Sequence, residues 1–158
     1  MIARVVLLTG IMVYSMYITN MIWSIVFTVI LVALSLKIHG LTLNYLSQNT
    51  AKKFIYRDFI KISASLIGSH LLQIILFAYY YYYAFHTFPD LKLFGGNFTG
   101  SFLDFFYYSI NCYTTLGTGD IYPNGTMRIA TGLEALIGLV LIAWTATFKL
   151  SYLFKNKN

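Results

Sequence analysis

Residues 113–123 read Tyr-Thr-Thr-Leu-Gly-Thr-Gly-Asp-Ile-Tyr-Pro, and this stretch decides how the rest of the chain is interpreted. Gly117 and Gly119 alternate with Leu116 and Thr118 behind a pair of threonines. Glycine tolerates backbone angles that other residues avoid, so this alternation suits a backbone whose successive carbonyls point the same way. A strand of that kind can coordinate a bare cation through its carbonyl oxygens.

The composition around this stretch is that of an integral membrane protein. Hydrophobic residues make up 58% of the 158 residues and charged residues only 10%, whereas charged residues are about a quarter of a soluble protein. The net charge of +6 comes mainly from lysines and arginines that flank the apolar runs. That placement indicates orientation in a membrane, so we expect lipids as partners and no nucleic acid.

The first apolar run covers residues 2–36 and contains Thr19-Asn20 as its only polar pair. A single helix of this length would reach about 50 Å across a hydrocarbon core of about 30 Å, whereas two helices would have about 16 residues each. Residues 2–36 can therefore form either one long tilted helix or two short helices. Thr-Asn without glycine or proline is a weak turn signal, which favours the single helix.

A polar and basic stretch follows at residues 37–58, with Lys52, Lys53 and Arg57. We expect it to be a cytoplasmic loop, because basic loops stay on that side of the membrane. The next apolar run, at about residues 62–85, would then lead outward and end in five tyrosines, residues 79–83, which suit the interfacial layer. A loop rich in glycine and polar residues extends to residue 100.

A short helix is predicted directly before the opening stretch. Ser101 and Asp104 are a typical helix start, in which the hydroxyl caps a free amide and the carboxylate lies near the positive end. A helix from there to about Thr114 would be some 20 Å long, too short to span and therefore re-entrant. After the turn at residues 122–125, the run at about 127–149 is long enough for one more spanning helix.

The segment Thr115-Leu116-Gly117-Thr118-Gly119-Asp120 resembles the selectivity filter of potassium channels. The resemblance extends to residues 101–114, which are similar to the pore helix of that family, and to residues 128–148, which are similar to the inner helix of its small bacterial members. It covers roughly residues 62–150. It implies an all-α membrane protein with an outer helix, a re-entrant pore helix carrying the filter, and an inner helix, preceded by the N-terminal segment.

On this basis the chain divides into an N-terminal segment with a basic loop, residues 1–58, and a pore domain, residues 59–158. One filter per chain cannot enclose an ion, so we expect a homotetramer. We expect a multi-pass protein of the cell membrane, as in a bacterial inner membrane, with a cytoplasmic C-terminus because lysines follow the last apolar run. No clustered nucleophile or metal-ligating set suggests an enzyme, and no cofactor is expected other than permeant K⁺ or Na⁺.

The expected ion ligands are the backbone carbonyls of Thr115, Leu116, Gly117 and Thr118, followed by Gly119, with passive K⁺ conduction as the function. Thr118 departs from the family, which usually has Tyr or Phe there. The aromatic brace behind the filter is then lost or replaced by a hydroxyl hydrogen bond. A weakly selective Na⁺/K⁺ channel and a non-conducting subunit that keeps the pore fold are therefore the alternatives.

Four further residues are candidates, each with two interpretations. Asp120 would form a carboxylate ring at the outer mouth, or would fix the filter through a hydrogen bond. Glu134, an acid inside the inner helix, would act in conduction or pair with a group behind the filter, such as Ser109, Asn111 or a hydroxyl. His70 would be a pH sensor or a neutral hydrogen-bonding residue. Gly138 would permit a gating bend or close helix packing.

Overall fold

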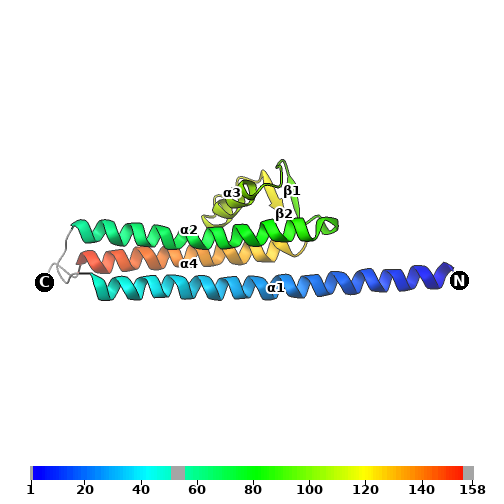
Figure 1. Cartoon of the computed structure of the whole chain (residues 1–158), viewed down its shortest axis with the longest axis horizontal. Coiled ribbons are helices and arrows are strands. Elements are labelled where there is room, and N and C mark those ends of the chain that lie inside the picture. Colours follow the sequence, from blue (N-terminus) through cyan, green and yellow to red (C-terminus); the bar gives the residue numbers. More distant parts are fainter. Residues whose placement is uncertain (1, 51–55, 155–158) are drawn as a thin grey trace.

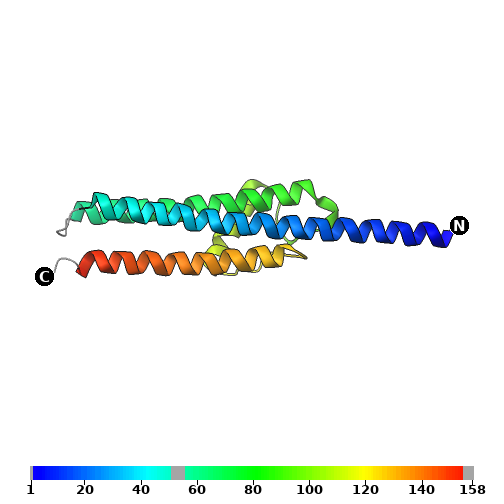
Figure 2. The ribbon, with the colours of Figure 1, turned by 90° about the horizontal axis from the view of Figure 1, so that it is seen from below.

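The computed structural model describes residues 2–50 and 56–154, with side chains from residue 18 onward. Three long helices lie side by side, and a short helix and a small sheet lie along one side of them near one end (Figure 1; Figure 2). The elements are α1 Ile2–Asn49, α2 Tyr56–Thr87, a 3₁₀ turn Pro89–Leu91, β1 Phe94–Gly96, α3 Phe102–Tyr113, β2 Ile121–Pro123 and α4 Met127–Phe154. Within the described residues, the regular structure is thus helical apart from two short strands.

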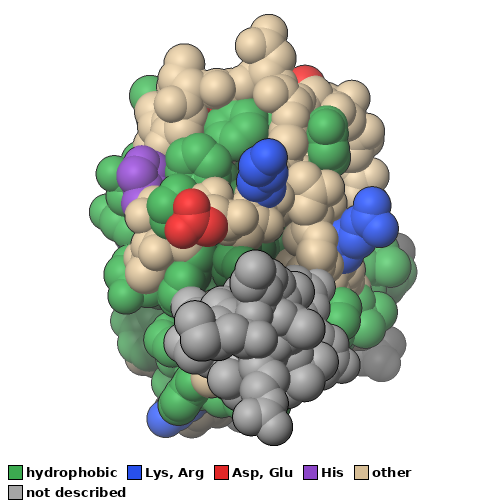
Figure 3. All heavy atoms as spheres, turned by 90° about the vertical axis from the view of Figure 1, so that its right-hand side faces the viewer, with side chains coloured by type: hydrophobic (Ala, Val, Ile, Leu, Met, Phe, Trp, Pro, Cys, Tyr) green, Lys and Arg blue, Asp and Glu red, His purple; other side chains and the backbone are tan. Residues whose placement is uncertain are grey.

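The three long helices, α1, α2 and α4, are each long and apolar enough to cross a membrane. In Figure 1, α1 and α4 run in one direction and α2 in the other, and the N-terminal part of α1 extends beyond the bundle. Figure 3 looks along the bundle from this side and shows a few charged side chains in the upper half and hydrophobic ones along the flanks. The arrangement agrees with the integral membrane protein that composition predicted.

The N-terminal run is a single helix, as the weak turn signal favoured. α1 continues to Asn49, and α2 begins at Tyr56. The expected loop at residues 37–58 is therefore wrong for residues 37–49 and for the first turn of α2. Lys52 and Lys53 lie outside the described residues, as do Lys155 and Lys157, which follow α4.

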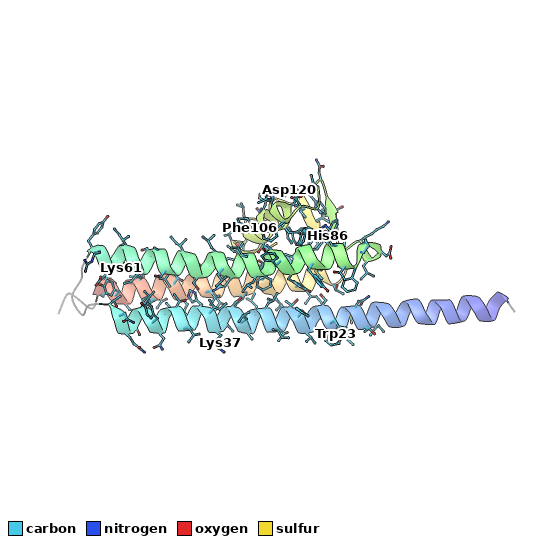
Figure 4. All side chains as sticks on the ribbon, in the orientation of Figure 1. Trp23, Lys37, Lys61, His86, Phe106 and Asp120 are labelled. Atoms are coloured by element: carbon cyan, nitrogen blue, oxygen red, sulfur yellow. The ribbon has the colours of Figure 1, made fainter. Side chains whose placement is uncertain are left out.

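The reason for the longer helix is a buried stripe on α1. Its residues recur every three or four positions: Thr28, Leu31, Ser35, His39, Leu43 and Leu46. This is the spacing of one helix face packed against neighbours. Lys37 projects from α1 away from the other helices (Figure 4). Of the polar residues that suggested a loop, His39 belongs to the buried face, while Lys37 and Asn44 are on the exposed side of the same helix.

The pore unit agrees closely with its prediction. The helix expected at about 62–85 is α2, the one expected at 101–114 is α3, and the one expected at 127–149 is α4. The start of α3 is the predicted capping box: Asp104 N donates to Ser101 Oγ (3.3 Å), and Ser101 N donates to Asp104 Oδ2 (3.0 Å). Twelve residues give α3 a length of about 18 Å, so it cannot cross a bilayer.

The small sheet was not predicted. β1 and β2 are antiparallel, with Gly96 opposite Ile121. Gly96 has φ +120°, and a Cβ there would lie 2.0 Å from the carbonyl oxygen of Asp120. Asn97 N also donates to that oxygen (3.2 Å). The Gly95-Gly96 pair therefore lets the loop before α3 clamp the backbone at the end of segment 115–120.

An aromatic cluster joins this sheet to the helices. Tyr81 of α2 packs against Tyr108 of α3 with ring centroids 5.3 Å apart, and Phe94 of β1 packs against Phe105 of α3 at 5.1 Å. All four side chains are buried. Edge-to-face aromatic contacts of this kind hold ring orientation as well as burying area, so α3 is fixed along one side of α2.

Candidate functional site

The residues from Thr115 to Asp120, here called the filter segment, form an extended ribbon between α3 and β2. Thr115, Gly117 and Gly119 have φ values of +57°, +61° and +78°, whereas Leu116 and Thr118 lie outside the positive region. A backbone that alternates positive φ values with other values can turn successive carbonyls to one side. The segment therefore has the φ pattern that a row of carbonyl ligands requires.

Thr115 is the residue of this ribbon that carries strain. A side chain in the left-handed region costs about 1–2 kcal/mol, which glycine avoids. Two backbone hydrogen bonds hold the turn out of α3: Thr115 N donates to Cys112 O (3.0 Å) and Leu116 N to Asn111 O (2.9 Å). The C-terminal end of α3, with the partial negative charge of its helix dipole, thus adjoins the start of the ribbon.

A chain of polar side chains braces the far end of the filter segment. Tyr107 OH donates to Thr118 Oγ1 (3.1 Å), and Thr118 Oγ1 donates to Asp120 Oδ1 (2.5 Å). Of the two outcomes considered for Thr118, the structure has the hydroxyl hydrogen bond. The bond from Thr118 also holds the pKa of the Asp120 carboxyl below its usual range. Asp120 lies on the side of the bundle away from α1 (Figure 4).

Glu134 lies behind the filter segment and is fully buried. Ser109 Oγ of α3 donates to its Oε1 (2.5 Å), and Tyr81 OH of α2 donates to its Oε2 (2.6 Å). Ser109 is one of the partners that the sequence suggested. The carboxyl group therefore joins α2, α3 and α4 and faces other side chains, not the ribbon of carbonyls.

Gly138 and His70 also contact the end of α3. A Cβ at residue 138 would lie 2.3 Å from the carbonyl oxygen of Tyr113, so α4 approaches the backbone of α3 there. His70 Nδ1 lies 2.7 Å from Tyr113 OH, and His70 Nε2 lies 2.8 Å from Thr145 Oγ1. Both observations agree with the packing and hydrogen-bonding interpretations of these residues.

Comparison with known proteins assigns the chain to a family. A family model described as an ion channel matches residues 69–155, more than half of the chain. The chain belongs to this ion channel family. No curated protein and no solved structure matches it. The ion channel match begins in α2, includes all of α3 and the filter segment, and ends at the C-terminal end of α4, so α1 lies outside it.

The structure of this ion channel places the predicted site residues in two groups. Thr115 to Asp120 form the ribbon, while Glu134, Gly138 and His70 each contact α3 behind it. His39 of α1 was not predicted as a site residue, because its burial depends on the packing of α2 and α4 against it. Tyr107 lies in a run of aromatic residues, 105–108, and the sequence did not show which of them would donate a hydrogen bond to Thr118.

Proposed function

We propose that the protein is a passive cation channel that conducts K⁺, with the backbone carbonyls of Thr115, Leu116, Gly117 and Thr118 as ion ligands. The alternating backbone angles of the filter segment carry this proposal. Carbonyl oxygens facing one side replace the hydration shell of a cation without the use of a charged side chain. The ion crosses down its gradient, since neither a cofactor nor a chemical step is needed.

The channel is proposed to be a homotetramer. One ribbon supplies carbonyls from one side only, so symmetric copies around an axis are needed to enclose an ion. Leu116, in the middle of the ribbon, exposes 68% of its surface in the single chain, and residues 114–120 are all exposed. A polar ribbon that turns its surface outward is poorly matched to lipid, which supports further copies of this chain as its neighbours.

The orientation in the membrane follows from the positive charges. Arg57, Lys61 and Lys149 lie at the end of the bundle opposite the filter segment, and Lys61 is labelled there in Figure 4. Basic residues favour the cytoplasmic side. We therefore assign the filter segment to the outer side and the C-terminus to the cytoplasm of a cell membrane, proposed as a bacterial inner membrane. α1, antiparallel to α2, then begins outside.

Selectivity for K⁺ rests on the brace at Thr118. The bonds from Tyr107 and to Asp120 fix the threonine hydroxyl on both sides, which supports a ribbon held at one width. The second candidate is a weakly selective Na⁺/K⁺ channel, favoured by the small size of Thr118 compared with an aromatic residue. A subunit that keeps the fold without conducting is the third.

Ion flux from liposomes tests this proposal. Purified protein is reconstituted into K⁺-loaded vesicles, and K⁺ efflux is measured with a fluorescent dye that reports the accompanying charge movement. We expect efflux from the wild type and none from Gly117→Ala, because φ +61° is unfavourable for a residue with a Cβ. Gly132→Ala is the control, since a Cβ at residue 132 meets nothing within 4 Å. Absence of efflux from a correctly assembled wild type would contradict the proposal.

A further inference from the structure

Six buried or partly buried polar side chains form a closed hydrogen-bond cycle between the helices. They come from α1 (His39), α2 (Ser69, His70, Gln73), the end of α3 (Tyr113) and α4 (Thr145). In order around the cycle, the distances are His39 to Thr145 3.2 Å, Thr145 to His70 2.8 Å, His70 to Tyr113 2.7 Å, Tyr113 to Gln73 2.5 Å, Gln73 to Ser69 3.3 Å and Ser69 to His39 3.3 Å.

Proton counting gives the cycle a direction. Tyr113 OH donates to the carbonyl oxygen Oε1 of Gln73, so it has no second proton and must accept from His70 Nδ1. A neutral His70 protonated at Nδ1 accepts at Nε2, and the donor there is Thr145. The single proton of Thr145 is then used, so His39 must donate to Thr145 from Nε2.

The remaining half of the cycle agrees with this direction. His39, protonated at Nε2, accepts at Nδ1 from Ser69 Oγ, and Ser69 Oγ accepts from Gln73 Nε2. Every member donates one hydrogen bond within the cycle and accepts one. The two histidines are therefore neutral and opposite in tautomer. Rotating the Gln73 amide by a half turn would reverse the whole cycle, and the tautomers would exchange but stay opposite.

One member of the cycle, Tyr113, lies next to the filter segment in the sequence. Tyr113 exposes only 1% of its surface, and its carbonyl oxygen is covered by Gly138. Two residues further on, the chain enters the left-handed turn at Thr115. The orientation of Tyr113 therefore fixes the start of the ribbon. His39 connects this point to α1, which lies outside the part of the chain that the ion channel family model matches.

We propose that His39 and His70 are filter-positioning residues, and that α1, through His39, is a working part of the pore and more than an anchor. The inference rests on the proposed function of the filter segment. His70 holds Tyr113 directly, while His39 acts through Thr145 and Ser69 by fixing which nitrogen of His70 carries the proton. An apolar residue at position 39 leaves Thr145 and Ser69 each with an unmet partner, and the cycle loses its direction.

The test compares three variants by reversal potential under opposing K⁺ and Na⁺ solutions. His39→Phe keeps a flat ring of similar size but opens the cycle, and we expect it to change the K⁺/Na⁺ permeability ratio by about threefold or more. His39→Gln offers one donor and one acceptor, so we expect it to restore the ratio. Ser24→Ala is the matched control, because Ser24 makes a different hydrogen bond between α1 and α2, to Tyr80 OH (2.7 Å).

An unchanged ratio in His39→Phe, or an equal change in all three variants, would overturn the inference and leave the channel itself standing. If His39→Phe does not assemble, Thr145→Val opens the same cycle from α4. A purely structural role would alter assembly without rescue of the permeability ratio by Gln. Current that is absent from the wild type would instead count against the proposed function.

The histidine tautomers provide a readout that needs no current. The chain has three histidines, so ¹⁵N spectra of histidine-labelled protein in bilayers are simple, and His86→Gln removes the one outside the cycle. We expect His39 protonated at Nε2 and His70 at Nδ1, with His39→Phe releasing His70 from its single tautomer. Two identical tautomers, or a charged ring at neutral pH in the wild type, would overturn the cycle.

Discussion

Gly138 of α4 lies against the carbonyl oxygen of Tyr113, and a Cβ at residue 138 would be 2.3 Å from it. The contact brings the last long helix onto the end of α3, one turn before the filter segment. A methyl group cannot fit there without moving one backbone away from the other. Close packing therefore accounts for this glycine without a bend in α4, which is continuous from Met127 to Phe154.

Gly138→Ala should destabilise the folded protein by about 1–3 kcal/mol, the usual effect of overpacking. Gly132→Ala should stabilise it slightly, because alanine favours a helix and a Cβ there meets nothing within 4 Å. Thermal unfolding in detergent compares the two variants with the wild type. Equal stability of both variants would show that α4 does not approach Tyr113 so closely.

Glu134 should tolerate replacement by glutamine and not by leucine. A glutamine can still accept a hydrogen bond from Tyr81 or Ser109, whereas leucine leaves the buried Tyr81 hydroxyl without its acceptor and Ser109 Oγ with only the carbonyl oxygen of Ile74. An unmet buried hydroxyl costs about 1–3 kcal/mol. We expect Glu134→Gln to keep near wild-type flux and stability, and Glu134→Leu to lose both. Loss of flux in a well-folded Glu134→Gln would indicate a role for the charge in conduction.

Thr118→Val should lower the K⁺/Na⁺ permeability ratio, because valine has nearly the same shape without the hydroxyl that joins Tyr107 to Asp120. Thr118→Ser keeps the hydroxyl and should retain most of the ratio. Tyr107→Phe removes one of the same two bonds, so its effect should not add to that of Thr118→Val. Additive effects in the double variant would show that the two hydrogen bonds of Thr118 act independently.

The carboxylate of Asp120 should raise conductance at low salt, where its field is weakly screened. Asp120→Asn should therefore reduce conductance more at low salt than at high salt. The hydrogen bond from Thr118 lowers the pKa of Asp120, so the charged form persists as the outer pH falls. We expect low-salt conductance to hold until the pH falls below about 3.9, the usual carboxyl pKa.

Thr118→Val removes that bond, so the pKa of Asp120 should rise toward its usual value and the loss of low-salt conductance should begin at a higher pH. Single-channel recordings over a pH series on the outer side measure both curves. A loss that begins at the same pH in both proteins would mean that Thr118 does not stabilise the carboxylate.

The sequence was sufficient to predict what short-range patterns encode. Ser101 and Asp104 marked the start of α3 because a capping box needs only residues three apart, and the apolar runs marked α2 and α4. The loop was predicted to begin too early, at residue 37, because polar residues from there onward were taken as loop residues. His39 is polar yet buried, and its burial depends on the packing of α1 against α2 and α4, which the sequence alone does not show.

In the candidate site, too, features set by neighbouring residues were predicted and features set by helix packing were not. The filter segment was predicted from its alternating glycines, which are neighbours in the sequence. The partners of its support residues are not: Tyr81 is 53 positions from Glu134, and Thr145 is 106 positions from His39. Hydrogen bonds over such separations depend on how the helices pack. Hydroxyl and imidazole groups in apolar helices indicate only that some partner is needed.

A bi-ionic reversal potential tests most directly whether the carbonyls of the filter segment select K⁺ in a channel built from this chain. K⁺ is placed on one side of a planar bilayer that holds the purified protein, and Na⁺ on the other. For the wild type we predict a reversal potential that is far from zero and has the sign set by the K⁺ gradient. For Gly117→Ala we predict no current. A reversal potential near zero, with wild-type current flowing, would contradict the claim.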